Sequence, residues 1–189
     1  MPKSIDLSAL VLASLSVLSP PLVVLLLRQF GAISAFCFVI ALLAGRLALP
    51  WLRGVPLSLS LAVVPVMIAM VSVGVFDQEF SVRLYPVFVN AAMLIVFAAS
   101  LLRPPTIIER FARGLEPDLP PEGVRYTRRV TQVWMAFFCL NGAIAMWTVM
   151  VPGWKFWLIY NGLIAYLAMG ILFGGEYLVR RWIRKRIAV

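Results

Sequence analysis

Two stretches of the chain decide which solvent it folds in: residues 137–147 read "FFCLNGAIAMW" and residues 158–167 read "LIYNGLIAYL". Each carries the pattern Asn-Gly-x-Ile-Ala inside a run that is otherwise apolar. A side-chain amide in such a run is costly in lipid unless it finds a hydrogen-bond partner. Asn141 and Asn161 therefore either hold helices together or contact a ligand.

The composition of the whole chain points to lipid as its solvent. Of the 189 residues, 62% are hydrophobic and 13% are charged, and the mean hydropathy is +0.96. Soluble domains are only about half apolar, so we expect residues 1–189 to form a single integral membrane domain. The net charge of +9 would suggest nucleic acid in a soluble protein. Here membrane topology explains the charge, and we expect no nucleic-acid partner.

The residues that usually hold metals are scarce. The chain has no histidine, and its two cysteines, Cys37 and Cys139, lie in apolar runs with no neighbour at ligand spacing. We therefore expect no metal site, no disulfide framework and no cofactor.

Six apolar windows approach the roughly 20 residues that a spanning helix needs. The sequence predicts an all-α, polytopic membrane bundle of six helices. Pro20-Pro21 interrupts the first window, and only Arg28-Gln29 separates it from the second, so the alternative is five spanning helices with a re-entrant first segment. The windows are Leu7–Leu27, Phe30–Gly45, Val55–Phe76, Leu84–Leu102, Val130–Val151 and Phe156–Gly175.

The basic residues predict the orientation of these helices. With six helices and the N-terminus inside, all but three of the 17 basic residues fall on the inner side, as cytoplasmic loops require. Residues 103–129 are then a cytoplasmic loop, and residues 177–189 are a basic cytoplasmic tail. The three on the outer side are Arg28, Arg83 and Lys155.

The cytoplasmic loop contains a second helical pattern. Ile107, Ile108, Phe111 and Leu115 recur at helical spacing on the face opposite the charged residues, and Gly114 is a natural stop. This predicts a short amphipathic helix on the inner membrane face. The alternative is a connector whose basic residues only fix topology. The side chains expected to contact lipid phosphates or a partner protein are Arg110, Arg113, Arg128 and Arg129.

Three asparagines are the main polar groups inside the predicted spans: Asn90, Asn141 and Asn161. Depths counted along the windows place Asn90 and Asn161 at the same level, about 9 Å from the outer ends of their helices. We expect those two to pair, while Asn141, nearer mid-membrane, needs another partner. Each such hydrogen bond stabilises packing by about 0.6–2 kcal/mol. Helix packing is the favoured role, and contact with a ligand is the alternative.

The four central spans from Val55 onward contain no acidic or basic residue. Proton relays and ion pathways generally use such groups, and we identify no catalytic residue. Trp154 and Trp157 flank the outer boundary of the last two spans and Trp134 lies near the inner one, which predicts an interfacial aromatic belt.

The second half of the chain resembles a known family. The matching features are "LYPVFVNAAMLIVFAASLL" at residues 84–102, "RPPTIIERFARG" at residues 103–114, a proline-containing link, and Trp134-x-x-Phe137-Phe138 followed by Gly142. These are similar to the intracellular septation protein A family of small bacterial inner-membrane proteins. The family places its asparagine in the fifth helix one turn later, at the position of Ala145.

The tail and the doubled Asn-Gly motif look more like an uncharacterised sister group of that family, some of whose members are labelled ketosynthase. Condensation by a ketosynthase requires a reactive cysteine with polar partners, usually histidine. The absence of histidine and the apolar setting of Cys37 and Cys139 argue against that chemistry in this chain.

The resemblance implies a non-enzymatic, multi-pass protein of the bacterial inner membrane that supports cell-envelope biogenesis, membrane integrity or septation. Its partners would be membrane lipids and other inner-membrane envelope proteins. Two alternatives remain open: a small transporter or flippase of a lipid-like substrate, and a membrane accessory of a fatty-acid-like or aryl-polyene pathway.

Overall fold

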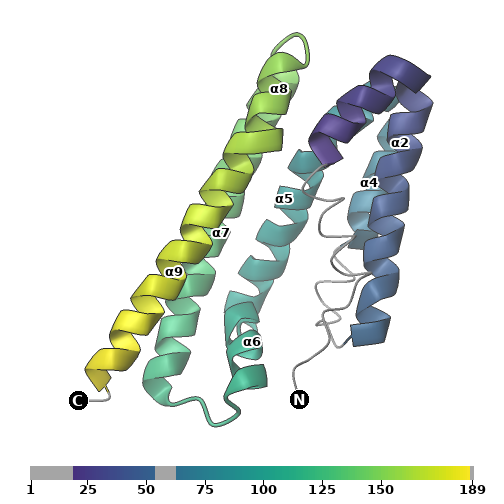
Figure 1. Cartoon of the computed structure of the whole chain (residues 1–189). Helices are drawn as coiled ribbons and strands as arrows, with labels where there is room; N and C mark the ends of the chain where they lie inside the picture. The colour runs from purple at the N-terminus through teal and green to yellow at the C-terminus, as the bar shows by residue number, and fades with distance from the viewer. Residues whose placement is uncertain (1–18, 54–62, 188–189) are drawn as a thin grey trace.

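The computed structural model describes residues 19–53 and 63–187, and these form an all-α structure of six helical segments (Figure 1). The last segment is composite, because a π-helical turn interrupts it. The expected all-α class is therefore confirmed. The elements are α2 (Ser19–Arg53), α4 (Val63–Gly74), α5 (Gln78–Leu102), α6 (Ile107–Leu115), α7 (Pro121–Met150) and α8 (Lys155–Ile159), which continues through η1 (Tyr160–Ile164) into α9 (Ala165–Ile187).

Among the described residues, four helices are long and apolar enough to cross a membrane. They indicate a multi-pass membrane protein. Helix α4 is apolar but shorter, and the residues before Val63 in its predicted window lie outside the described part of the chain. The four candidate spans are Leu22–Gly45, Gln78–Leu102, Pro121–Met150 and Lys155–Arg181.

Helix α2 bends at Gly31, so its candidate span is two arms and not one straight rod. Gly31 has φ 82° and ψ 177°, a backbone conformation that favours a residue without a Cβ. We expected the break at Pro20-Pro21. Instead both prolines lie in the first turn of α2, where proline is tolerated. The part of the predicted segment Leu7–Leu27 that precedes Ser19 lies outside the described residues.

Helix α5 is the centre of the bundle, because it contacts α2, α4 and α7. One apolar core joins these helices to the start of the last segment and includes Val39, Met70, Val82 and Trp157. The helices approach closely: a Cβ added to Gly74 of α4 would lie 2.5 Å from the Phe36 ring of α2.

A second core of aromatic residues joins α5, α6 and α7. It contains Phe97, Ile107, Trp134 and Phe138, and the Trp134 ring also lies 4.5 Å from the ring of Phe173 in α9. Trp134 is only 5% exposed. The prediction that it belongs to an interfacial belt is therefore wrong, because packing against three other helices buries it.

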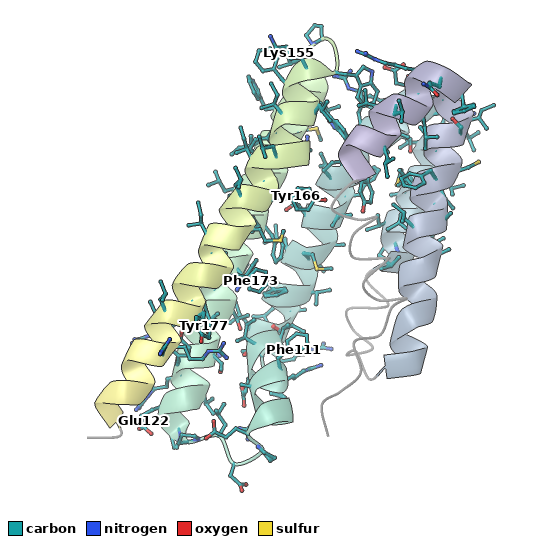
Figure 2. The ribbon with its side chains drawn as sticks, in the orientation of Figure 1. Phe111, Glu122, Lys155, Tyr166, Phe173 and Tyr177 are labelled. Carbon is teal, nitrogen blue, oxygen red and sulfur yellow. The ribbon has the colours of Figure 1, made fainter. Side chains whose placement is uncertain are left out.

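The predicted cytoplasmic loop is more helical than expected. Helix α6 forms as predicted and ends one residue past Gly114, whereas α7 begins at Pro121, nine residues before the predicted window. Helix α6, the start of α7 and the end of α9 lie at one end of the bundle, here called the α6 end (Figure 1). The corner of α2 and the turn before α8 lie at the opposite end, the α8 end. Figure 2 accordingly shows Lys155 at the α8 end and Phe111, Glu122 and Tyr177 toward the α6 end.

Candidate functional site

A chain of hydrogen bonds links three helical segments inside the bundle. The Asn141 Nδ2 donates to the Asn90 Oδ1 at 2.9 Å, and the Tyr160 hydroxyl donates to the Asn141 Oδ1 at 2.8 Å. The Asn90 Nδ2 in turn donates to the carbonyl of Pro86 at 2.7 Å. Both asparagines are buried. Helices α5 and α7 and the π-helical turn are thus joined through amide and phenol groups.

The expected pairing of Asn90 with Asn161 is wrong, and the start of α5 explains why. Helix α5 begins at Gln78, six residues before the predicted window. Asn90 therefore lies about 18 Å along its helix, close to the level of Asn141, which lies about 14 Å from the end of α7 at Met150. The partner that Asn141 lacked in the sequence prediction is Asn90.

Gly142 lets the two asparagine-bearing helices come close. A Cβ added at Gly142 would lie 3.1 Å from the Asn90 Cβ. Small residues at such contacts allow the close backbone approach that membrane helix pairs use. The Asn-Gly pair of α7 therefore works as one unit, in which the amide bonds to Asn90 and the glycine makes room for it.

The second Asn-Gly pair lies in the π-helical turn η1. The Asn161 Nδ2 donates to the Thr148 Oγ1 at 3.1 Å and to the carbonyl of Trp157 at 3.0 Å. Neighbouring residues of a regular α-helix point about 100° apart, yet Tyr160 and Asn161 both reach α7 here. The π-helical turn is therefore the place where two adjacent polar side chains both bond to one partner helix.

Arg83 holds the end of α7, a role that the sequence did not reveal. Its Nη2 donates to the carbonyls of Val151 at 2.7 Å and Gly153 at 3.0 Å, and its guanidinium lies 5.5 Å from the ring centroid of Trp154. The last carbonyls of a helix lack partners within the helix and carry partial negative charge. The one available signal was that Arg83 is basic and on the predicted outer side, against the bias of the rest of the chain.

Trp157 is also part of this end of the bundle. Its indole Nε1 donates to the carbonyl of Arg83 at 2.9 Å, and the side chain is 1% exposed. The prediction of an interfacial belt is therefore wrong for Trp157, because α2, α5 and the rest of the first core cover it. Trp154 is partly buried and donates to the Glu79 carboxylate at 3.1 Å.

The four arginines predicted to contact lipid or a partner fall into two groups. Arg113 binds Glu109 at 2.8 Å and donates to the Pro117 carbonyl at 3.3 Å, and Arg110 donates to the Pro105 carbonyl through its Nε. Arg128 and Arg129 are exposed and make no hydrogen bond or ion pair with any described residue.

Glu109 explains why Arg113 is engaged. The Glu109 side chain is buried, at 5% exposure, and forms a capping box with Thr106 at the start of α6. A buried carboxylate needs a nearby cation or hydrogen-bond donors, and Arg113, four residues later on the same face, supplies both. At the α6 end, therefore, Arg128 and Arg129 are among the arginines that can bind an outside group.

The two regions differ in the chemistry they offer. The polar groups of the α8 end bond to one another and fix the helices, whereas the α6 end presents unpaired guanidinium groups beside apolar surface.

The chain matches no model of a known protein family, no curated protein and no solved structure.

Proposed function

We propose that this protein is a non-enzymatic, multi-pass protein of the bacterial inner membrane that supports cell-envelope biogenesis, membrane integrity or septation through lipid or protein partners. The resemblance in residues 84–142 motivates the cellular role. In this proposal the C-terminus is cytoplasmic, so the α6 end faces the cytoplasm and the α8 end faces the periplasm.

One observation carries the molecular part of the proposal: each buried amide bonds to a side chain of a neighbouring segment. Asn90, Asn141 and Asn161 all have partners on neighbouring segments. An amide that orients a ligand would direct its side-chain donor at the ligand's place, whereas the Nδ2 groups of these three asparagines all donate within the bundle. The groups left for outside partners are the apolar faces and the free arginines.

Co-purification from native membranes tests the proposed role. The full-length chain, tagged at its C-terminus and extracted in a mild detergent, should retain envelope or division proteins and membrane lipids. A strain that lacks the chain should be sensitive to detergent and osmotic stress. A deletion strain that divides normally and tolerates both stresses would contradict the proposal.

The π-helical turn supports a second candidate, a small transporter or flippase of a lipid-like substrate. Such turns often occur at functional sites, and η1 contacts α2, the helix with the bend at Gly31. Transport of a fluorescent phospholipid across liposomes that contain the purified protein would establish this function. If Asn161→Leu lost that transport and kept its unfolding temperature, the role of Asn161 would be substrate contact and not helix packing.

A further inference from the structure

An apolar groove lies between helices α7 and α9. Its volume is about 450 Å³. Several of the lining side chains are well exposed, including Leu140 at 65% and Ile171 at 76%. The lining residues are Val133, Ala136, Phe137, Leu140, Ala168, Ile171 and Leu172.

A free positive charge lies directly beyond this groove. Arg129 precedes Val133 by four residues, so it lies on the same face of α7, one turn closer to the α6 end. It is exposed and has no partner among the residues that the structure describes. The apolar groove and the guanidinium together match an amphiphile with an anionic head and a hydrocarbon tail.

The α9 side of the groove leaves room for a head group beside Arg129. Gly175 follows Ile171 by one turn, and a Cβ added there would meet no atom within 4 Å. Two contacts show which residues of α7 and α9 lie at the same level: Trp134 with Phe173, and Tyr126 with Glu176. Arg129 lies between the two α7 residues, and Gly175 lies between the two α9 residues. Gly175 is therefore about level with Arg129.

We infer that this groove binds an anionic phospholipid, with an acyl chain along α7 and α9 and the phosphate on Arg129. The inference rests on the proposed function and names the lipid class. The guanidinium fork suits a phosphate because it can donate two parallel hydrogen bonds. The groove suits an acyl chain because apolar side chains of both helices line it along its length.

Lipid retention by the purified protein tests this assignment. The detergent-solubilised, full-length protein is mixed with equimolar phosphatidylglycerol and phosphatidylcholine, and the lipids that stay bound are counted by native mass spectrometry. The wild type should retain phosphatidylglycerol in preference to phosphatidylcholine. Arg129→Gln should reduce that preference about fivefold, the value of one arginine at an anionic surface.

Arg128→Gln is the matched control, because Arg128 is the neighbouring residue and is also exposed without a described partner. It faces away from Val133 by more than a quarter turn, so it should retain the wild-type preference. An equal loss in both variants would overturn the site and leave only general attraction to basic charge.

Filling the groove tests the acyl-chain half of the assignment. Ala136→Phe places a ring in the groove and should lower retention of both lipids severalfold. Ala91→Phe, at an exposed alanine of α5 away from the groove, should not. Unchanged retention in Ala136→Phe, with wild-type helicity by circular dichroism, would overturn the groove. Because these measurements need no cellular phenotype, their failure is distinguishable from a failure of the envelope role.

Discussion

The two halves of α7 show two ways in which a membrane helix meets its neighbours. Toward the α8 end, α7 is fixed by the bonds of Asn141, Thr148 and Val151 to two other segments, α5 and η1. Toward the α6 end, it contacts α9 mainly through the Trp134–Phe173 ring pair and the bond between Tyr126 and Glu176. In lipid, apolar contact alone drives helices together weakly. Polar bonds therefore hold α7 close to its neighbours toward the α8 end. Where such bonds are few, an apolar groove remains between α7 and α9.

The cap on α7 should be the strongest single contribution to the closed half. Arg83→Met keeps the length of the side chain and removes the charged hydrogen bonds to the carbonyls of Val151 and Gly153. We expect the free energy of unfolding to fall by about 1.5–3 kcal/mol, the value of hydrogen bonds to a charged group. Thermal unfolding of the purified protein in detergent, followed by tryptophan fluorescence, measures it.

The matched control for this change is Arg103→Met. Arg103 is also a helix-terminal arginine of α5, but it is exposed and its side chain has no partner among the described residues. Its substitution should leave the unfolding midpoint within error of the wild type. Equal shifts in the two variants would mean that Arg83 contributes only charge and not the cap.

A double-mutant cycle tests which asparagines are paired. Asn90→Ala and Asn141→Ala remove the two sides of one hydrogen bond, and we expect a coupling energy of about 0.6–1.7 kcal/mol between them, the range for such bonds in membrane bundles. The cycle of Asn90→Ala with Asn161→Ala should be additive within about 0.5 kcal/mol. Coupling between Asn90 and Asn161, with additive effects at Asn90 and Asn141, would favour the pairing expected from the sequence.

The sequence predicted the helices better than it predicted their ends. The window Leu84–Leu102 lies inside α5, and the window Val130–Val151 runs only one residue past the end of α7, because apolar length is a strong signal for a span. The first turns of α5 and α7 are polar, so apolar length does not detect them. Helix α5 starts before Arg83, with Asp77 as its cap, and this short extension shifts the depth of Asn90 by about 9 Å. The asparagine partner was wrong for that reason.

The π-helical turn marks a second limit of the sequence. The repeat of Asn-Gly-x-Ile-Ala predicts that Asn141 and Asn161 have equal roles, but their surroundings differ. Asn141 lies in a regular helix, whereas Asn161 lies in a wider turn that also directs Tyr160 to α7. No periodicity in the apolar residues indicates the extra residue, because it depends on packing between segments far apart in the chain.

Paired alanine substitutions at two glycines sharpen the contrast between closed and open contacts. A Cβ at Gly142 would press on Asn90 at 3.1 Å, whereas a Cβ at Gly170 of α9 would meet no atom within 4 Å. Gly142→Ala should lower the free energy of unfolding by about 1 kcal/mol, as mild overpacking does. Gly170→Ala should be neutral or raise it by a few tenths, because alanine favours helix. Thermal unfolding of both variants decides, and a stabilised Gly142→Ala would contradict the close approach.

The smallest expected effect concerns Arg113, and it separates two kinds of arginine at the α6 end. Its guanidinium is bound to Glu109 and to the Pro117 carbonyl, and its side chain is 41% exposed. Because a glutamine amide at this position can still donate to Glu109, Arg113→Gln should cost only about 0.3–1 kcal/mol in the free energy of unfolding. It should leave phosphatidylglycerol retention unchanged, because a guanidinium already bound within the chain has little to offer a phosphate. If Arg113→Gln lowered that retention as much as Arg129→Gln, the lipid head group would lie over α6 and not at the groove.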